Sequence, residues 1–229
     1  TLNLVWSKIL YAMEITTKQI QQVETYLDKK NFDFIDLKVE VLDHMISDIE
    51  SFLDRNYSFE NAFKITILKW EKHFKESSSF YFGFQYHESK IVVKKAIKMF
   101  RPFYFLYLAV YILPFAFLKL VPIKVAEDIA SFINSFLVSS ASILLAYLFI
   151  IFIKTKRSKV KTTYRFIIKT QYLSLVLLVL GVFLGAVFND EGEMNAVYTG
   201  FTSGGFAVVF TCYYFYKKHK EAIKKYKIL

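Results

Sequence analysis

The chain has 229 residues, of which 55% are hydrophobic and 19% aromatic, and its formal net charge is +10. Soluble domains of this length are usually less apolar, so a membrane protein is the first hypothesis. The single cysteine, Cys212, excludes a disulfide within the chain and a zinc site built from cysteines.

The positive charge is unevenly distributed. Residues 13–87 hold 9 Lys and Arg against 13 Asp and Glu, a net of −4, whereas residues 88–229 hold 20 against 7, a net of +13. A nucleic-acid-binding protein usually concentrates positive charge on a folded polar domain, but here the charge lies beside apolar segments. The distribution argues against nucleic acid as a partner and favours a lipid bilayer.

The chain begins with a short segment that precedes Met13, where a passage typical of an amino terminus starts. We interpret Met13 as the native start and residues 1–14 as an N-terminal extension. Asn3, Ser7 and Lys8 interrupt the apolar character of this segment, which is not typical of a signal peptide.

Residues 15–79 predict three amphipathic helices, which together form a small cytosolic domain that we name the prefix domain. Helices are expected over residues 17–29, with Thr16 or its neighbour as the cap, and over residues 34–55. The third begins after Ser58, another favourable cap. The expected apolar stripes are Ile20, Val23 and Leu27; Val39, Leu42, Ile46, Ile49 and Leu53; and Phe59, Ala62, Phe63, Ile67, Trp70 and Phe74.

The second predicted helix contains the acidic stretch EVLDHMISDIE, residues 40–50. At helical spacing, His44 has Glu40 and Asp48 as neighbours four residues away. A metal site would need a further ligand such as His73 or His87, and a pH-sensing role would rest on His44 alone. We favour a third interpretation, a solvated surface for docking a protein. This candidate interaction surface, the acidic face, consists of Glu40, Asp43, His44, Ser47 and Glu50.

The stretches LKVEVLDH at 37–44 and SFENAF at 58–63 resemble the HAAS and permease-prefix domains, which are helical modules at the cytosolic amino termini of bacterial membrane proteins. Those modules carry an E-x-x-D-[HY] signature, then a break with glycine, then S-x-E-E-A. Here Asn56 and Tyr57 stand in place of the glycine. The resemblance covers residues 15–76 and implies a regulatory or protein-interaction role without catalytic residues. A helical prefix followed by about four spans also resembles small uncharacterised bacterial membrane proteins.

A juxtamembrane connector of aromatic and basic residues, 80–102, follows the prefix domain. The aromatic side chains of residues 77–89 suit the headgroup level of a bilayer. The stretch after residue 89 combines apolar residues with lysines. It would extend the first membrane span into the cytoplasm or lie on the inner leaflet as an amphipathic helix, and we favour the extension.

Four apolar runs are long enough to cross a bilayer, which predicts an all-α membrane protein with a four-helix transmembrane bundle. Pro114 is expected to kink the first span. The predicted spans are residues 103–123, 129–153, 166–188 and 196–216, followed by a basic cytosolic tail at 217–229.

Lysine and arginine in the short loops predict the orientation of these spans. Residues 154–169 contain seven basic and no acidic residues, and the tail contains six lysines and one glutamate. The loop at 189–195 has three carboxylates and no basic residue. Both termini are therefore expected in the cytoplasm of a bacterium, with the protein in the inner membrane. Specific recognition of anionic lipid is an alternative use of the same lysines.

Small residues recur every three or four positions in three of the spans, which allows close approach of another helix. Packing of the third span on the fourth is the simplest use, and an oligomer interface is the second. The candidate helix-packing residues are Ser131, Ser135 and Ser139, continued by Ser142 and Ala146; Gly181 and Gly185; and Gly200 and Gly204.

No carboxylate, histidine or arginine lies near the centre of a predicted span, where such a group would indicate an ion or proton pathway. The leading hypothesis is a regulatory or scaffolding membrane protein whose prefix domain binds a protein partner or self-associates. The alternative is a small transporter, channel or lipid-handling protein with a groove near Pro114, Ser135 and Ser139. An enzyme comes third, because the sequence shows no catalytic constellation. We expect no cofactor, no metal and no specific small-molecule ligand.

Overall fold

A computed structural model describes residues 15–227, apart from the side chains of residues 173, 174, 177, 182 and 227. The interpretation of Met13 and residues 1–14 lies outside the described residues.

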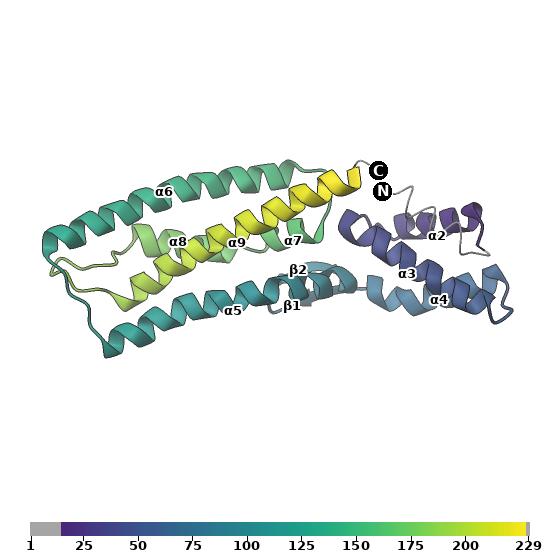
Figure 1. Ribbon diagram of the computed structural model, residues 1–229, viewed down its shortest axis with the longest axis horizontal. Helices are drawn as coiled ribbons and strands as arrows, with labels where there is room; N and C mark the ends of the chain where they lie inside the picture. Colours follow the sequence, from purple (N-terminus) through teal and green to yellow (C-terminus); the bar gives the residue numbers. More distant parts are fainter. Residues whose placement is uncertain (1–14, 228–229) are drawn as a thin grey trace.

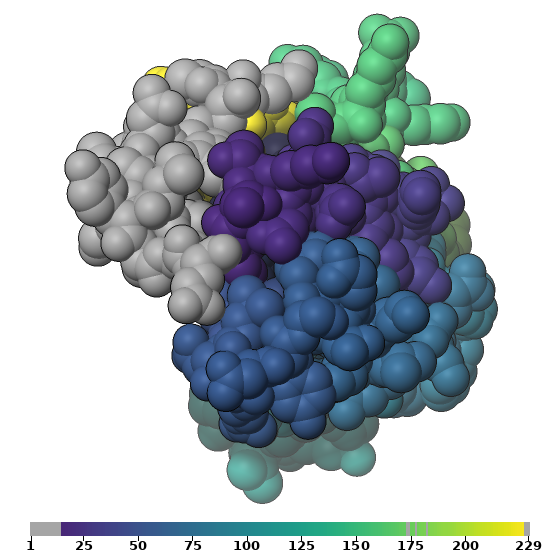
Figure 2. Space-filling view, turned by 90° about the vertical axis from the view of Figure 1, so that its right-hand side faces the viewer, coloured from purple at the N-terminus to yellow at the C-terminus, as the bar shows by residue number. Residues whose placement is uncertain are grey.

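The protein is mostly helical and elongated, with α2, α3 and α4 gathered at one end and α5 to α9 running lengthwise (Figure 1). Viewed from the prefix end, α2, α3 and α4 cover most of the visible surface (Figure 2). The elements are α2 (Thr17–Lys29), α3 (Ile35–Leu53), α4 (Phe59–Phe74), β1 (Glu76–Ser79), β2 (Gly83–Ser89), α5 (Lys90–Leu120), α6 (Glu127–Arg157), α7 (Thr163–Lys169), α8 (Tyr172–Phe183) and α9 (Ala196–Lys227).

The first helix of the prefix domain has the bounds expected from the sequence. Thr16 Oγ1 accepts a hydrogen bond from the Gln19 amide at 3.4 Å, and Gln19 Oε1 accepts one from the Thr16 amide at 2.8 Å. This reciprocal pair is a capping box. In α4, Ser58 Oγ accepts from the Asn61 amide in the same way. Capping by Thr16 and Ser58 thus sets the start of two of the three helices.

The buried face of α3 differs from the expected stripe. Leu37, Val41 and Met45 are buried together with Ile46 and Ile49, whereas Val39 is exposed. The reason is that α3 packs against α9 as well as against α2 and α4, so a second row of its apolar residues is covered. The row that contains Leu37 therefore belongs to the core.

A β-hairpin, which the all-α expectation did not include, occupies most of residues 76–89. The antiparallel strands β1 and β2 pair Glu76 with Ser89 at the open end and Ser79 with Gly83 near the tip. Gly83 has φ +88°, a left-handed conformation that suits glycine in a tight turn. Phe82 at the tip is buried, and its ring centroid lies 5.3 Å from that of Phe166 in α7.

Among the residues that the structure describes, α5 and α6 are the two helices long and apolar enough to cross a membrane. Helix α5 is one helix of 31 residues that continues through Pro102 and Pro114. The connector after residue 89 therefore extends the first predicted span as a helix, as we favoured. Lys90 begins that helix directly after β2.

The third predicted span is interrupted, contrary to the expectation of a single helix over residues 166–188. Helix α7 ends at Lys169, α8 begins at Tyr172, and α8 ends at Phe183. Thr170 Oγ1 donates to the Ile167 carbonyl at 2.6 Å, so a side chain bonds a carbonyl at the end of α7. Helix α9, by contrast, continues beyond the predicted fourth span to Lys227.

The glycines of α8 and α9 lie where helices approach closely. A Cβ added to Gly181 would lie 2.4 Å from Phe201 Cβ, and one added to Gly185 would lie 1.9 Å from the Tyr198 ring. The Gly181 contact joins α8 to α9, and the Gly185 contact joins the segment just after α8 to α9, as expected for the third and fourth predicted spans.

The glycines of α9 that we assigned to the same hairpin face α5 instead. A Cβ on Gly200 would lie 2.9 Å from the Tyr111 carbonyl oxygen, and one on Gly204 would lie 2.1 Å from the Tyr111 ring. The candidate packing residues of α6 do not pack within the chain either: Ser131, Ser135, Ser139, Ser142 and Ala146 are exposed. The packed side of α6 is formed by other residues, which include the small Ala130 and Ala141 as well as Leu148 and Ile151.

We predict that Gly181→Ala destabilises the bundle by about 1–3 kcal/mol, because the new methyl group overlaps Phe201 Cβ. Thermal unfolding in detergent, followed by circular dichroism, measures the effect. Ser139→Ala on the exposed side of α6 is the matched control and should change stability by less than about 0.5 kcal/mol. Equal effects of the two substitutions would contradict close packing of α8 on α9.

Candidate functional site

The structure places the acidic face on the solvent side of α3. Asp43, His44 and Ser47 are exposed and Glu50 is half-buried. Glu40 is also exposed, but its Oε2 lies 2.8 Å from Lys95 Nζ of α5. Among the described residues, Asp43, His44 and Glu50 form no ion pair, and Glu40 joins the acidic face to α5.

Two carboxylates of the acidic face, Asp43 and Glu50, and the neighbouring Asp54 directly after α3 lack a neutralising partner. Burial raises the pKa of Glu50, and the charges of Asp54 and Asp43 raise it further. Within the described part of the chain, no lysine or arginine forms an ion pair with these three groups, and Glu50 Oε1 is buried without a hydrogen-bond partner. Repulsion among the three carboxylates therefore favours binding of a positively charged group.

Other carboxylates of the prefix domain are engaged within the chain. Asp48, in the same acidic stretch, accepts hydrogen bonds from Lys69 Nζ at 2.6 Å and Trp70 Nε1 at 2.8 Å. Lys38 pairs with Asp28, and Lys30 pairs with Glu71. Asp48 thus connects α3 to α4 and is not available as part of a docking surface.

The prefix domain is bound to the bundle at the amino terminus of α7, and we name this contact the junction. Asp36 is buried, and its Oδ1 accepts a hydrogen bond from the Thr163 amide at 2.9 Å. A carboxylate at a helix amino terminus is favoured by the unpaired amides and by the positive end of the helix dipole. The Ile35 amide donates to the Lys161 carbonyl at 3.1 Å, and Lys161 Nζ lies 3.0 Å from Asp33 Oδ1.

Lys95 of α5 connects the junction to the acidic face. Its Nζ donates to the Asp36 carbonyl at 3.0 Å and to Glu40 Oε2 at 2.8 Å. Lys95 is half-buried. Through these two bonds its ammonium group joins α3 to α5 on the side of the acidic face. One end of that face is therefore part of the contact between domain and bundle.

His219 near the end of α9 supports the same loop from the other side. The imidazole is buried, with Nδ1 2.8 Å from Thr162 Oγ1 and Nε2 3.3 Å from Ser158 Oγ. Thr162 Oγ1 accepts from the Arg165 amide, so its own proton is free for His219 Nδ1. Burial and, to a smaller extent, the charge of Arg165 lower the pKa of His219 to about 4, which keeps the ring neutral.

The sequence analysis did not identify Asp36 or His219. A pair of threonines before a basic, apolar helix is a capping signal, and Thr162 indeed caps α7 through the Arg165 amide. Nothing in the sequence pattern indicates that Asp36, 127 residues away, bonds the next amide. His219 lies among lysines and therefore has the pattern of a solvated tail.

A polar network lies inside the bundle where α7 and α8 meet. Tyr107 of α5 donates to Gln171 Oε1 at 3.1 Å. Gln171 Nε2 donates to the Ile167 carbonyl at 3.2 Å and to Thr170 Oγ1 at 3.0 Å. Both the oxygen and the nitrogen of the Gln171 side-chain amide are hydrogen-bonded. The network therefore stabilises the break between α7 and α8, and the amide offers no unpaired group to a ligand.

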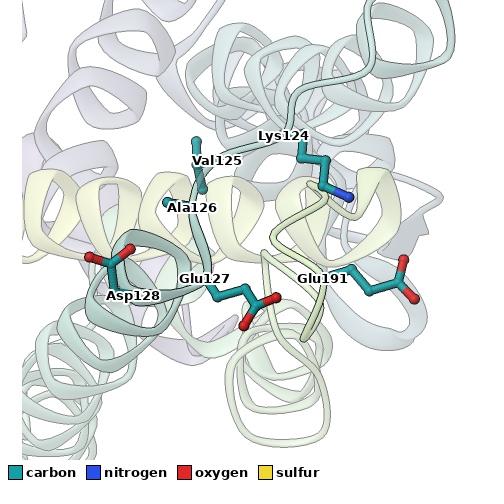
Figure 3. A pocket seen from close by; sticks show the side chains of 6 residues that line it. All are labelled: Lys124, Val125, Ala126, Glu127, Asp128 and Glu191. Carbon is teal, nitrogen blue, oxygen red and sulfur yellow. The ribbon is translucent and has the colours of Figure 1, made fainter.

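At the end of the bundle away from the prefix domain, two loops enclose a hollow (Figure 3). The Val125 amide donates to the Gly192 carbonyl at 2.9 Å, which joins the loops, and Lys124 Nζ lies 3.6 Å from Glu193 Oε1. In the described part of the chain, no group of three or more His, Cys, Asp or Glu is placed to hold a metal ion. The lining residues are Lys124, Val125, Ala126, Glu127, Asp128 and Glu191.

No protein-family model, no curated protein and no solved structure matches the chain.

We predict that Asp36→Ala loosens the junction. Loss of the carboxylate leaves the Thr163 amide without its partner and should cost about 0.5–2 kcal/mol. Hydrogen exchange followed by mass spectrometry should show faster exchange in α7. Asp43→Ala, a carboxylate on the exposed face of the same helix, is the matched control. Unchanged protection of α7 in Asp36→Ala would contradict the capping role.

We predict that His219 makes the protein less stable in acid. The folded-state pKa is about 4, below the ordinary value of 6.5, so the unfolded chain binds the proton first. The stabilisation is complete above pH 6.5 and is lost as the pH falls toward 4. Melting temperatures measured across this range should fall more steeply for the wild type than for His219→Gln. Parallel curves would show that His219 is not buried as a neutral ring.

Proposed function

We propose that this protein is a four-span protein of a bacterial inner membrane that regulates or scaffolds a partner protein through its prefix domain. The acidic face would be the contact surface. The observation that carries the proposal is the group of carboxylates Asp43, Glu50 and Asp54, which the described ion pairs leave unneutralised and of which Asp43 and Asp54 raise the pKa of Glu50. The resemblance to HAAS and permease-prefix domains agrees with this role.

The outer surface of the bundle supports the membrane location. Large apolar side chains on α5 and α6 are exposed, including Leu113, Ile143 and Phe149. Exposed apolar surface that is continuous along two long helices marks contact with lipid or with another protein. Helices α7, α8 and α9 pack in the same bundle, which is why we include residues 166–188 and 196–216 as the third and fourth spans.

The ends of the bundle differ in charge, which supports cytoplasmic termini. The connection from α6 to α7 and the last turns of α9 carry basic residues and lie at the end where the prefix domain docks (Figure 1). The opposite end carries Glu127, Asp128 and Glu191. The positive-inside rule then places the prefix domain in the cytoplasm.

The partner surface is expected to be basic. Charges at the rim of an interface attract a partner of opposite sign and set the rate of association. His44 and Ser47 lie between the carboxylates on the exposed side of α3 and offer polar contacts. Binding should weaken as salt concentration rises, because exposed charges are screened over about 10 Å at 0.1 M salt.

A transporter or lipid-handling protein is the second candidate, favoured by the interruption between α7 and α8. Interrupted helices often form the substrate sites of transporters. In this protein, however, Gln171 at the interruption is fully bonded, and Ser135 and Ser139 lie on the outside of α6. These observations support the scaffolding role over a groove among the spans.

We predict that neutralising the acidic face abolishes partner capture. A photo-crosslinking amino acid at the exposed position Ser47 should yield a defined adduct in native membranes, identified by mass spectrometry. The isosteric double variant Asp43→Asn/Glu50→Gln should lose the adduct, because the attraction for a basic surface is removed.

The matched control is Glu127→Gln/Asp128→Asn, which removes the same charge from the opposite end of the bundle. The control should retain the adduct in full. An adduct of equal yield in both double variants would show that the acidic face does not bind the partner.

A further inference from the structure

The β-hairpin brings aromatic side chains to one level of α5. From the start of α5 at Lys90, strand β2 leads back to Gly83, so the hairpin lies beside the first turns of the helix (Figure 1). At the tip, the Phe82 ring lies 5.4 Å from Phe100, and the Tyr81 ring lies 4.9 Å from Tyr104. The tip therefore reaches α5 about three to four turns beyond its start.

The lengths of the two elements agree with this placement. Strand β2 has seven residues and extends about 23 Å, and the helix from Lys90 to Tyr104 rises about 21 Å. Tyr104 is the second residue of the proposed first span, residues 103–123. The tip thus lies where α5 changes from a basic to an apolar surface.

Two aromatic rings of the tip face away from the protein. Phe80 and Phe84 are 70% and 67% exposed, and the Phe80 ring lies 6.4 Å from Tyr104. The neighbouring ring, Phe82, is buried and anchors the hairpin to α5 and α7. An anchored turn that presents two phenylalanines to the outside is costly in water and needs an apolar environment to cover it.

We propose that the hairpin tip, residues 80–84, inserts into the headgroup region of the cytoplasmic leaflet of the bilayer that α5 crosses. The occupant is lipid, because the tip continues the exposed apolar surface of α5 that begins with Phe105 and Leu108. Aromatic side chains favour this depth of a bilayer. The inference rests on the proposed function in one respect, namely that α5 spans a membrane.

Charge on α5 agrees with a lipid surface at this level. Three exposed basic residues of α5 precede Tyr104, namely Lys94, Lys98 and Arg101. Basic residues next to a span are attracted to the anionic lipids of the cytoplasmic leaflet. The hairpin is then a second contact that fixes the prefix domain at the membrane, independent of the hydrogen bonds at the junction.

The experiment uses the full chain with Cys212→Ala, reconstituted in vesicles of phosphatidylcholine and phosphatidylglycerol. Single variants Phe80→Cys and Phe84→Cys carry a small fluorophore, and emission is measured with lipids whose nitroxide lies near the headgroup or deep in the acyl chain. Leu68→Cys on α4, at a residue that is 71% exposed, is the aqueous control. Ile143→Cys, at a residue in the middle of α6 that is also 71% exposed, is the lipid control.

We expect a loss of emission at Phe80→Cys and Phe84→Cys that is larger with the shallow nitroxide than with the deep one. Leu68→Cys should keep its emission with both, and Ile143→Cys should lose more with the deep nitroxide. If Phe80→Cys and Phe84→Cys keep their emission, as Leu68→Cys does, while the emission of Ile143→Cys is quenched, the hairpin does not insert. The proposed membrane location would then still hold.

Two further outcomes would also overturn the proposal. If Ile143→Cys keeps its emission, α6 is not in the bilayer, and both the membrane location and the insertion of the hairpin fail together. If Leu68→Cys is quenched as strongly as the hairpin labels, the whole prefix domain lies on the lipid, and the hairpin is not the specific point of contact.

Discussion

The bundle depends on the close approach of other helices to α9, which contacts α3, α5, α6, α7 and α8. Apolar side chains gain little by leaving lipid for another helix, so association in a bilayer comes from close packing and hydrogen bonds. Gly204 and Gly205 of α9 allow Tyr111 of α5 and Leu178 of α8 to reach its backbone. Beyond the apolar part, the same helix places His219 against Thr162. Helix α9 therefore packs against the other helices of the bundle and also supports the loop on which the prefix domain docks.

The polar contacts around that loop form a connected series. His219 bonds Thr162, which caps α7, and the next amide of α7 bonds Asp36 of the prefix domain. Lys95 then joins the Asp36 carbonyl and Glu40 to α5. The series joins residues of α9, the loop before α7, α3 and α5 through hydrogen bonds and one ion pair. The acidic face lies at the end of this series.

The sequence predicted the helices of the prefix domain well, and it predicted contacts between distant segments poorly. Thr16 and Ser58 defined helix starts because capping depends only on residues within one turn. The row around Leu37 and the role of Asp36 depend on α9 and α7, which no local pattern contains. The hairpin was missed because the aromatic run at its tip also suits a headgroup-level connector. Asp43, His44 and Ser47 of the acidic face are exposed, since exposure follows from helical periodicity once the core side is known.

Helix α5 has a mechanical consequence, because its 31 residues join the prefix domain to the bundle with a single stiff element. Its length is about 46 Å, about 16 Å more than the hydrocarbon thickness of a bilayer. In the proposed membrane orientation, the part outside the hydrocarbon would form a short lever arm whose pivot lies at the membrane surface. A force applied to the prefix domain would then act as a torque on the angle at which α5 crosses α9.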